Sequence, residues 1–303
     1  MYYVLTLLSV IILAVDFAFK KKYQLIAGEN TASGLYYNAV LGLTTAIVFF
    51  FINGFMNGFS NITVNPFVLA TATGMGVCSF VYCILGFVMM AKGTMAFYMI
   101  FLMTGGMLVP YVFGVVSLGE WSELAPRQIV LRIVGMLIMI FGVIISNRTK
   151  NGGKIVKSMI ILGICVFFLN GGCSVSSKIH QLPDFSDIAA TAESFVMLTG
   201  FIKFLLCAGG LVFLRAKSPE AVREVPRVKT FPWIIASTVA SGVSYLFQLY
   251  GASHMPASVL YPLITGGCIV FTSFAGVLCF KEKLTKEMVL GIALCTVGTL
   301  FFI

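Results

Sequence analysis

Long runs of apolar residues follow one another along almost the whole chain, separated by short polar segments. A helix needs about 20 apolar residues to cross the hydrocarbon core of a membrane. The runs are continuous rather than alternating, which favours helices over the strands of a barrel. We therefore expect an all-α polytopic membrane protein with about ten transmembrane helices, at residues 2–19 (or to 27), 34–53, 67–90, 94–117, 129–146, 156–176, 190–214, 231–250, 256–279 and 287–303.

Composition favours the same class of protein. Of the 303 residues, 59% are hydrophobic and only 10% are charged, whereas soluble domains carry about a quarter charged residues. Few residues lie between the apolar runs, so the sequence predicts no large domain outside the membrane. We expect an integral, multi-pass protein of the cell (plasma) membrane.

Short elements of the first half of the chain recur in the same order in the second half. A duplication of this kind in a polytopic membrane protein is typical of secondary transporters. The matching elements are Lys21 with Lys178, Ala91 with Ala252, Ala96 with Ala257, Thr104-Gly105-Gly106 with Thr265-Gly266-Gly267, Glu120 with Glu282, Gly135 with Gly291 and Gly142 with Gly298.

Each half contains five predicted spans, and this odd number has a topological consequence. The second half must enter the membrane with the opposite orientation, which gives two inverted five-helix repeats related by a pseudo-two-fold axis in the membrane plane. We expect a first repeat at residues 1–148, a linker at 149–153 and a second repeat at 154–303. Two such halves can exchange conformations, so that a solute held between them is exposed to each side in turn.

A glutamate follows an apolar span near the end of each half, in Leu118-Gly119-Glu120 and in Lys281-Glu282-Lys283. With the late lysines Lys21 and Lys178 and the glycine-spaced closing spans, this pattern resembles the drug/metabolite transporter superfamily, EamA-like branch. The resemblance covers essentially the whole chain and implies ten spans in two five-helix repeats. It also implies transport, because relatives move amino acids, nucleotide sugars, sugar phosphates, quaternary amines and drugs. Many relatives carry a basic residue in the second span, where this chain has Asn38.

The formal net charge of +9 would suggest a nucleic-acid partner in a soluble protein. Here the basic residues cluster in the odd-numbered loops, and the positive-inside rule explains this bias. We therefore expect no nucleic-acid partner, odd loops in the cytoplasm and both termini outside. The basic segments are Lys20–Lys22, Lys92, 148–157, 215–229 and 281–286.

Two ionisable residues, Asp16 and Lys203, stand clearly inside predicted spans. A charge at mid-bilayer costs about 2.5–3.5 kcal/mol on insertion scales, so such residues are functional candidates by default. If the first helix ends at the lysines, Asp16 forms an interfacial pair with Lys20. If the helix continues, Asp16 faces the cavity and carries a proton or holds a cationic group. Lys203 either binds a carboxylate or phosphate or extends its stem to the interface, and a pairing of Asp16 with Lys203 across the halves is a third alternative.

The matched Thr-Gly-Gly elements are a second set of candidates. Glycine-interrupted spans at matching positions of the two halves point to a transporter site, and prolines in the same spans favour kinks. The elements either line the cavity or let neighbouring helices pack closely. The residues concerned are Thr104, Gly105, Gly106, Pro110, Pro262, Thr265, Gly266 and Gly267. Further polar candidates for substrate contact within spans are Asn38, Tyr98, Asn170, Gln248 and Tyr261.

These patterns favour a secondary active transporter of a small organic solute, such as a metabolite, amino acid or drug, working by alternating access with a coupling proton or ion. An enzyme is disfavoured, because an aspartyl intramembrane protease needs two acids in spans and only Asp16 qualifies. The sequence holds no HExxH motif, and we expect no catalytic residue, metal or cofactor. A membrane-embedded receptor, scaffold or channel is the alternative, although a repeated selectivity-filter element is absent. We expect a monomer or homodimer within the lipid bilayer.

Overall fold

The structure of the chain is a computed structural model that describes residues 2–28, 30–60, 62–92, 95–122, 125–146, 157–223, 225, 227–281 and 286–302. All the elements in these ranges are helical, which confirms the predicted all-α class with about ten long helices. The linker expected at 149–153 and Glu282 lie outside the described residues. The elements are α1 (Tyr2–Ala27), α2 (Thr31–Asn57), α3 (Pro66–Lys92), α4 (Met95–Ser117), α5 (Pro126–Ser146), α6 (Lys157–His180), a 3₁₀ turn η1 (Pro183–Phe185), α7 (Ala192–Lys217), α8 (Pro219–Arg223), α9 (Arg227–His254), α10 (Ala257–Phe280) and α11 (Lys286–Leu300).

Most of these helices are long and apolar enough to cross a membrane. Within the described ranges, 8 helices meet both requirements, and Phe101–Ser117 and Val289–Leu300 form shorter apolar helices. Short polar side chains begin several of them, because the first N–H groups of a helix have no partner within it. Asn30 accepts a hydrogen bond from Ser33 N at the start of α2 (2.6 Å), and Asn65 accepts one from Val68 N at the start of α3 (2.9 Å).

The first helix does not end at its lysines. It continues to Ala27, and its last turns are held inside the protein because Tyr23 is buried and donates to Ser33 O of α2 at 2.7 Å. Asp16 therefore lies near the middle of α1 rather than at its end. Of the two alternatives for this helix, the structure shows the longer one.

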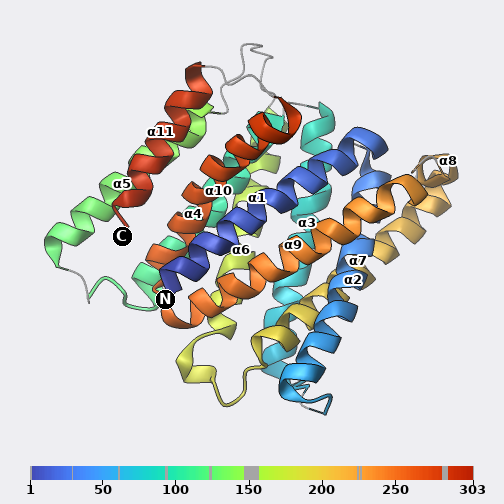
Figure 1. Cartoon of the computed structure of the whole chain (residues 1–303), viewed down its shortest axis with the longest axis horizontal. Helices are drawn as coiled ribbons and strands as arrows, with labels where there is room; N and C mark the ends of the chain where they lie inside the picture. Colours follow the sequence, from blue (N-terminus) through green and yellow to red (C-terminus); the bar gives the residue numbers. More distant parts are fainter. Residues whose placement is uncertain are drawn as a thin grey trace.

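The helices pack in a pattern that is the same for both halves of the chain (Figure 1). Helix α1 packs against α9 and α10, just as α6 packs against α3 and α4. The remaining main contacts join equivalent helices of the two halves: α2 with α7, α4 with α10 and α5 with α11. This is the packing that an inverted repeat requires, since each half uses the same surfaces toward the other.

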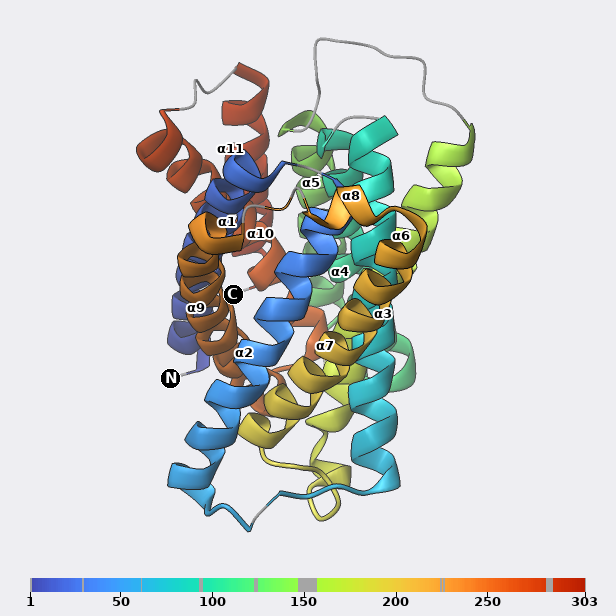
Figure 2. The same cartoon turned by 90° about the vertical axis from the view of Figure 1, so that its right-hand side faces the viewer.

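The two ends of the helix bundle are built from different elements (Figure 2). At one end α1 finishes shortly after Lys20, Lys21 and Lys22, and α8 follows α7; we call this the basic end. At the opposite end α2 finishes at Asn57, and residues 181–191 connect α6 to α7.

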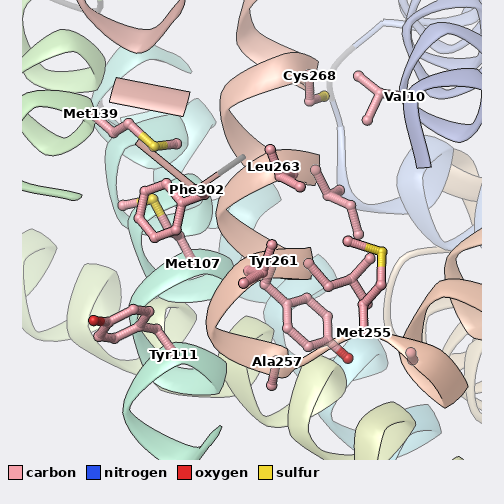
Figure 3. Packing of buried hydrophobic residues seen from close by; sticks show 14 residues of the cluster. Val10, Met107, Tyr111, Met139, Met255, Ala257, Tyr261, Leu263, Cys268 and Phe302 are labelled. Atoms are coloured by element: carbon pink, nitrogen blue, oxygen red, sulfur yellow. The ribbon is translucent and has the colours of Figure 1, made fainter. Parts of the chain in front are cut away.

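Helix α10 is the centre of the largest buried apolar cluster, which lies toward the opposite end. Val10 of α1 lies on one side of this helix, and Met107, Met139 and Phe302 lie on the other (Figure 3). The buried apolar side chains of this cluster come mainly from α1, α4, α5, α9 and α10, so the cluster joins the α1–α10 pair to α4 and α5.

Helices α2 and α7 approach each other backbone to backbone at Gly42 and Gly200. A Cβ atom on Gly42 would lie 2.7 Å from Gly200 O and 2.8 Å from Phe204 N, and neither backbone atom can move aside easily. Glycine at this crossing lets two main chains meet in the middle of the molecule.

We predict that Gly42→Ala lowers the melting temperature of the purified protein in detergent, because the added methyl group overpacks the crossing at a cost of about 1–3 kcal/mol. Gly209→Ala on α7 is the matched control: its Cβ would meet nothing within 4 Å, and alanine is the better helix former. Equal melting temperatures for the two variants would contradict the close approach.

Candidate functional site

A cavity lies between the two halves of the molecule and consists of two adjoining chambers. The outer chamber has a volume of about 370 Å³ and reaches the basic end, where Lys20, Lys21 and Phe280 line it. The inner chamber has a volume of about 340 Å³ and lies deeper, where Gly42 and Gly200 line it. Residues common to both chambers mark their boundary: Leu13, Leu41, Tyr82, Lys203 and Ser241.

Asp16 lines the outer chamber and accepts a hydrogen bond from one hydroxyl group, which is itself bonded to a second hydroxyl. Ser237 Oγ of α9 donates a hydrogen bond to Asp16 Oδ1, and Tyr37 OH of α2 is hydrogen-bonded to the same Ser237 hydroxyl. The Asp16 side chain is only 8% exposed. These bonds join α1, α2 and α9 at mid-height and supply the polar partners that a carboxylate in the membrane requires.

Lys203 stands near the middle of α7 and lines both chambers. Among the residues that the structure describes, no hydrogen bond or ion pair within 4.0 Å satisfies its ammonium group. The structure thus brings the two ionisable residues singled out in the sequence to one cavity, but as separate groups rather than as a direct pair.

Four of the other candidates also line the cavity. Asn38 and Tyr98 line the outer chamber, and Asn170 and Gln248 line the inner one. Asn170 donates to Leu102 O at 2.7 Å and Gln248 donates to Ser244 Oγ at 3.1 Å. Each amide is therefore oriented by a neighbour while its side chain lines the cavity.

Thr104, Thr265 and Tyr261 lie away from both chambers. Both threonines are buried, and Tyr261 donates to Ser174 O at 2.6 Å. The adjoining glycines lie where helices meet closely: a Cβ atom on Gly105 would overlap the backbone of Phe167 in α6.

The other glycines of the matching elements also lie where a neighbouring helix packs closely, and the two prolines stand within helices. A Cβ atom on Gly106 would lie 2.6 Å from Asn170 Nδ2, and one on Gly267 would lie 2.9 Å from the side chain of Val10. A Cβ atom on Gly266 would lie 2.6 Å from the side chain of Met139. Pro110 and Pro262 stand inside α4 and α10.

One residue of the inner chamber has no signal in the sequence. Thr45 is buried and lines this chamber, and its Oγ1 has no hydrogen-bond partner among the residues that the structure describes. The neighbouring Thr44 donates from its Oγ1 to Val40 O, one turn earlier in the same helix, at 2.8 Å. Threonines within helices commonly make this bond. Adjacent threonines are equivalent in the sequence, and only the packing of α2 against α7 distinguishes them.

Beyond the inner chamber, toward the opposite end, the molecule is closed by buried side chains. Phe49 lies one turn past Thr45 on α2, and Phe195 lies one turn before Thr199 on α7. Both phenylalanines are buried with Leu249 of α9 in one apolar cluster.

Polar contacts at the same end hold the closed arrangement. Lys178 is buried at the end of α6, and its Nζ donates to Ala252 O at 2.7 Å and to Met255 O at 2.8 Å. Glu120 accepts bonds from Ala257 N (2.6 Å) and Ser258 N (2.9 Å), where α10 begins. A carboxylate at a helix N-terminus is stabilised by the N–H groups and by the helix dipole.

A second polar cluster joins α2, α7 and α9 at this end. Glu193 accepts bonds from Tyr250 OH at 2.5 Å and from Asn57 Nδ2 at 3.3 Å. Thr191 Oγ1, which caps α7, also donates to Asn53 Oδ1 at 2.8 Å. The first turn of α7 is thus fixed to α2 and α9 by hydrogen bonds from several side chains.

The eight cysteines are free and form no disulfide in the part of the chain that the structure describes. Two of them line the cavity: Cys83 accepts a hydrogen bond from Asn38 Nδ2 at 2.8 Å, and Cys173 donates to Met75 O at 3.5 Å. In the ranges that the structure covers, no three His, Cys, Asp or Glu side chains come together as a metal site would need.

Known proteins resemble this chain in sequence and in fold. A family model described as Small Multidrug Resistance protein matches residues 222–295. The probable 4-amino-4-deoxy-L-arabinose-phosphoundecaprenol flippase subunit ArnE of Hamiltonella defensa subsp. Acyrthosiphon pisum (strain 5AT) is 31% identical over 104 residues, which are 34% of this chain and 91% of that protein. A protein solved by crystallography matches 99% of this chain and 94% of its own with a TM-score of 0.70 at 15% identity, which is a likeness of fold.

The flippase subunit is matched over nearly its whole length at an identity above 30%, and the family model matches within the second half. The helical fold and the central cavity are consistent with these likenesses. The chain is therefore a multi-pass integral membrane protein that belongs to the drug/metabolite transporter superfamily.

Proposed function

We propose that this protein is a secondary active transporter that moves a small organic solute across the cell membrane by alternating access. The observation that carries the proposal is the cavity, which holds Asp16 and Lys203 between the two halves, reaches one end of the molecule and is closed at the other. The relatives support transport as the activity, since one is named a probable flippase subunit and the family model is named for multidrug resistance.

The inverted repeat supplies the second state. Lys178 closes the opposite end by bonding Ala252 O, and the counterparts of these residues in the first repeat are Lys21 and Ala91, which both lie at the basic end. In the exchanged conformation Lys21 takes the equivalent place at the end of α3 and closes the basic end. The present arrangement, with Lys21 lining the outer chamber and stacked over Phe280 at 4.8 Å, is the state open at the basic end.

The positive-inside rule assigns the basic end to the cytoplasm. The termini then lie outside, and the structure represents the inward-open state of a protein that works as a monomer or homodimer. Energy comes from gradients of solutes or ions, with Asp16 as the coupling group because its carboxylate lines the cavity and accepts a hydrogen bond from Ser237 of the other half.

Transport itself is tested by counterflow in proteoliposomes preloaded in turn with an amino acid, a sugar phosphate or a quaternary amine. Exchange of a labelled solute against its own unlabelled form is expected for at least one of these classes. A receptor or scaffold would exchange none of them, and that result would contradict the proposed function.

Asp16→Asn is predicted to abolish accumulation driven by a pH gradient while counterflow persists, because the amide preserves the packing but cannot exchange a proton. Asp184→Asn, an exposed acid in η1, is the control and keeps wild-type accumulation. Accumulation by Asp16→Asn at the wild-type rate, with an unchanged pH profile, would remove Asp16 from the coupling step.

Lys178→Met and Lys21→Met are predicted to shift the two-state equilibrium in opposite directions. Loss of the charged donor from the Lys178 contact destabilises the present state by about 1.5–3 kcal/mol, so hydrogen exchange at residues 252–260 increases. Lys21→Met removes the equivalent contact of the other state, so exchange in the same segment decreases. Mass spectrometry measures both, and a change of the same sign in both variants would refute the paired arrangement.

A further inference from the structure

We propose that Lys203 and Thr45 form a binding site for the anionic group, a carboxylate or a phosphate monoester, of an organic solute that enters through the outer chamber. The inference rests on the proposed function in taking the cavity as the path of the solute. It adds the chemical class of that solute and the place of its charged group.

The first argument is the balance of charge inside the cavity. The Asp16 carboxylate already accepts a bond from Ser237, which Tyr37 supports, so its charge has partners within the protein. Lys203 has no ion pair or hydrogen bond among the described residues, although it stands near the middle of α7 and lines both chambers. An ionisable group within a transmembrane span is costly unless it is paired, and a bound anion supplies the missing partner.

The second argument is the position of Thr45 beside Lys203. A Cβ atom on Gly200 would lie 3.1 Å from Thr45 Cβ, so Thr45 packs against α7 at Gly200. Lys203 is three residues further along α7, and residues at this spacing share one face of a helix. Thr45 Oγ1 is buried and has no partner, which marks it as a donor for a group that enters the chamber with the solute.

The third argument is the set of neutral polar side chains in the inner chamber. Ser79, Thr199 and Gln248 line this chamber together with Thr45 and Lys203. Hydroxyl and amide groups of this kind can donate hydrogen bonds to the oxygens of a bound carboxylate or phosphate.

The entrance has the charge that such a solute needs. Lys20 and Lys21 both line the outer chamber where it reaches the basic end. Among the residues that line this chamber, three ammonium groups (Lys20, Lys21 and Lys203) outnumber the one carboxylate, Asp16. A cleft with a net positive lining raises the local concentration of anions.

Ligand stabilisation of the purified full-length protein tests the proposal with four probes that share one ring. These are phenylacetate, phenyl phosphate, phenylacetamide and phenethylamine. One or both anions are expected to raise the melting temperature, and the amide and amine are not; the stronger anion identifies carboxylate or phosphate as the preferred group. Stabilisation by neither anion, or equal stabilisation by the amide and the amine, would overturn the proposal.

Variants test whether the anion binds at Lys203 and Thr45. Lys203→Met is expected to weaken binding of the anion about tenfold or more, as for the loss of a charge-assisted hydrogen bond, while Lys203→Arg retains it. Lys217→Met, at the end of the same helix, is the control for removal of a lysine. Thr45→Val is expected to weaken binding and Thr44→Val is not; equal effects of the two threonine variants would overturn the role of Thr45, even if Lys203→Met failed to fold.

Counterflow of the bound anion in proteoliposomes distinguishes this site from the transport function. Binding that depends on Lys203 without any exchange would contradict transport and leave the anion site in place. Exchange of phenylacetamide or phenethylamine that is insensitive to Lys203→Met would contradict the anion site and leave transport in place.

Discussion

Polar groups within a bilayer must find their partners inside the protein, and this constraint governs the whole molecule. Helices satisfy the backbone, but the ionisable side chains need a second solution. Asp16 accepts a hydrogen bond from the Ser237 hydroxyl of α9, and Lys178 donates to two backbone carbonyls. Each of these contacts joins segments that are far apart in the sequence, so the groups that are most costly to bury also determine how the halves meet. Lys203 makes no such contact with any residue that the structure describes, and for that reason it is informative about what the cavity binds.

Lys178 and Lys21, which match in the two halves of the sequence, have different surroundings at the two ends of the molecule. At the opposite end, Lys178 and Glu120 hold the start of α10, and Phe49, Phe195 and Leu249 fill the space below the inner chamber. At the basic end, the equivalent lysine lines an accessible chamber. An inverted repeat has two such arrangements of similar energy, and a solute or ion needs only a modest difference in affinity to favour one of them.

Sequence reasoning was most successful where the physical signal is periodic or additive. The apolar runs predicted the helices within a few residues, and the only consequential ambiguity was the end of α1, which continues to Ala27 because Tyr23 is buried against α2. Asp16 and Lys203 could also be identified as candidate site residues from the sequence, because charged residues within predicted spans are few. By contrast, three other candidates lie away from both chambers: Thr104, Thr265 and Tyr261. The sequence could not distinguish them, because a small or polar residue in a span serves helix packing as readily as ligand binding.

The sequence by itself determined the all-α membrane class and about ten helices, because these follow from hydropathy, and it predicts the duplication and the inverted relation of the halves. Only the tertiary structure decided which side chains share a cavity, which end is closed, and that Thr45 rather than Thr44 lines the chamber with a hydroxyl that has no partner among the described residues. These features depend on how helices rotate and cross, and the crossing of α2 and α7 at Gly42 and Gly200 is set by contacts between residues that are distant in the chain.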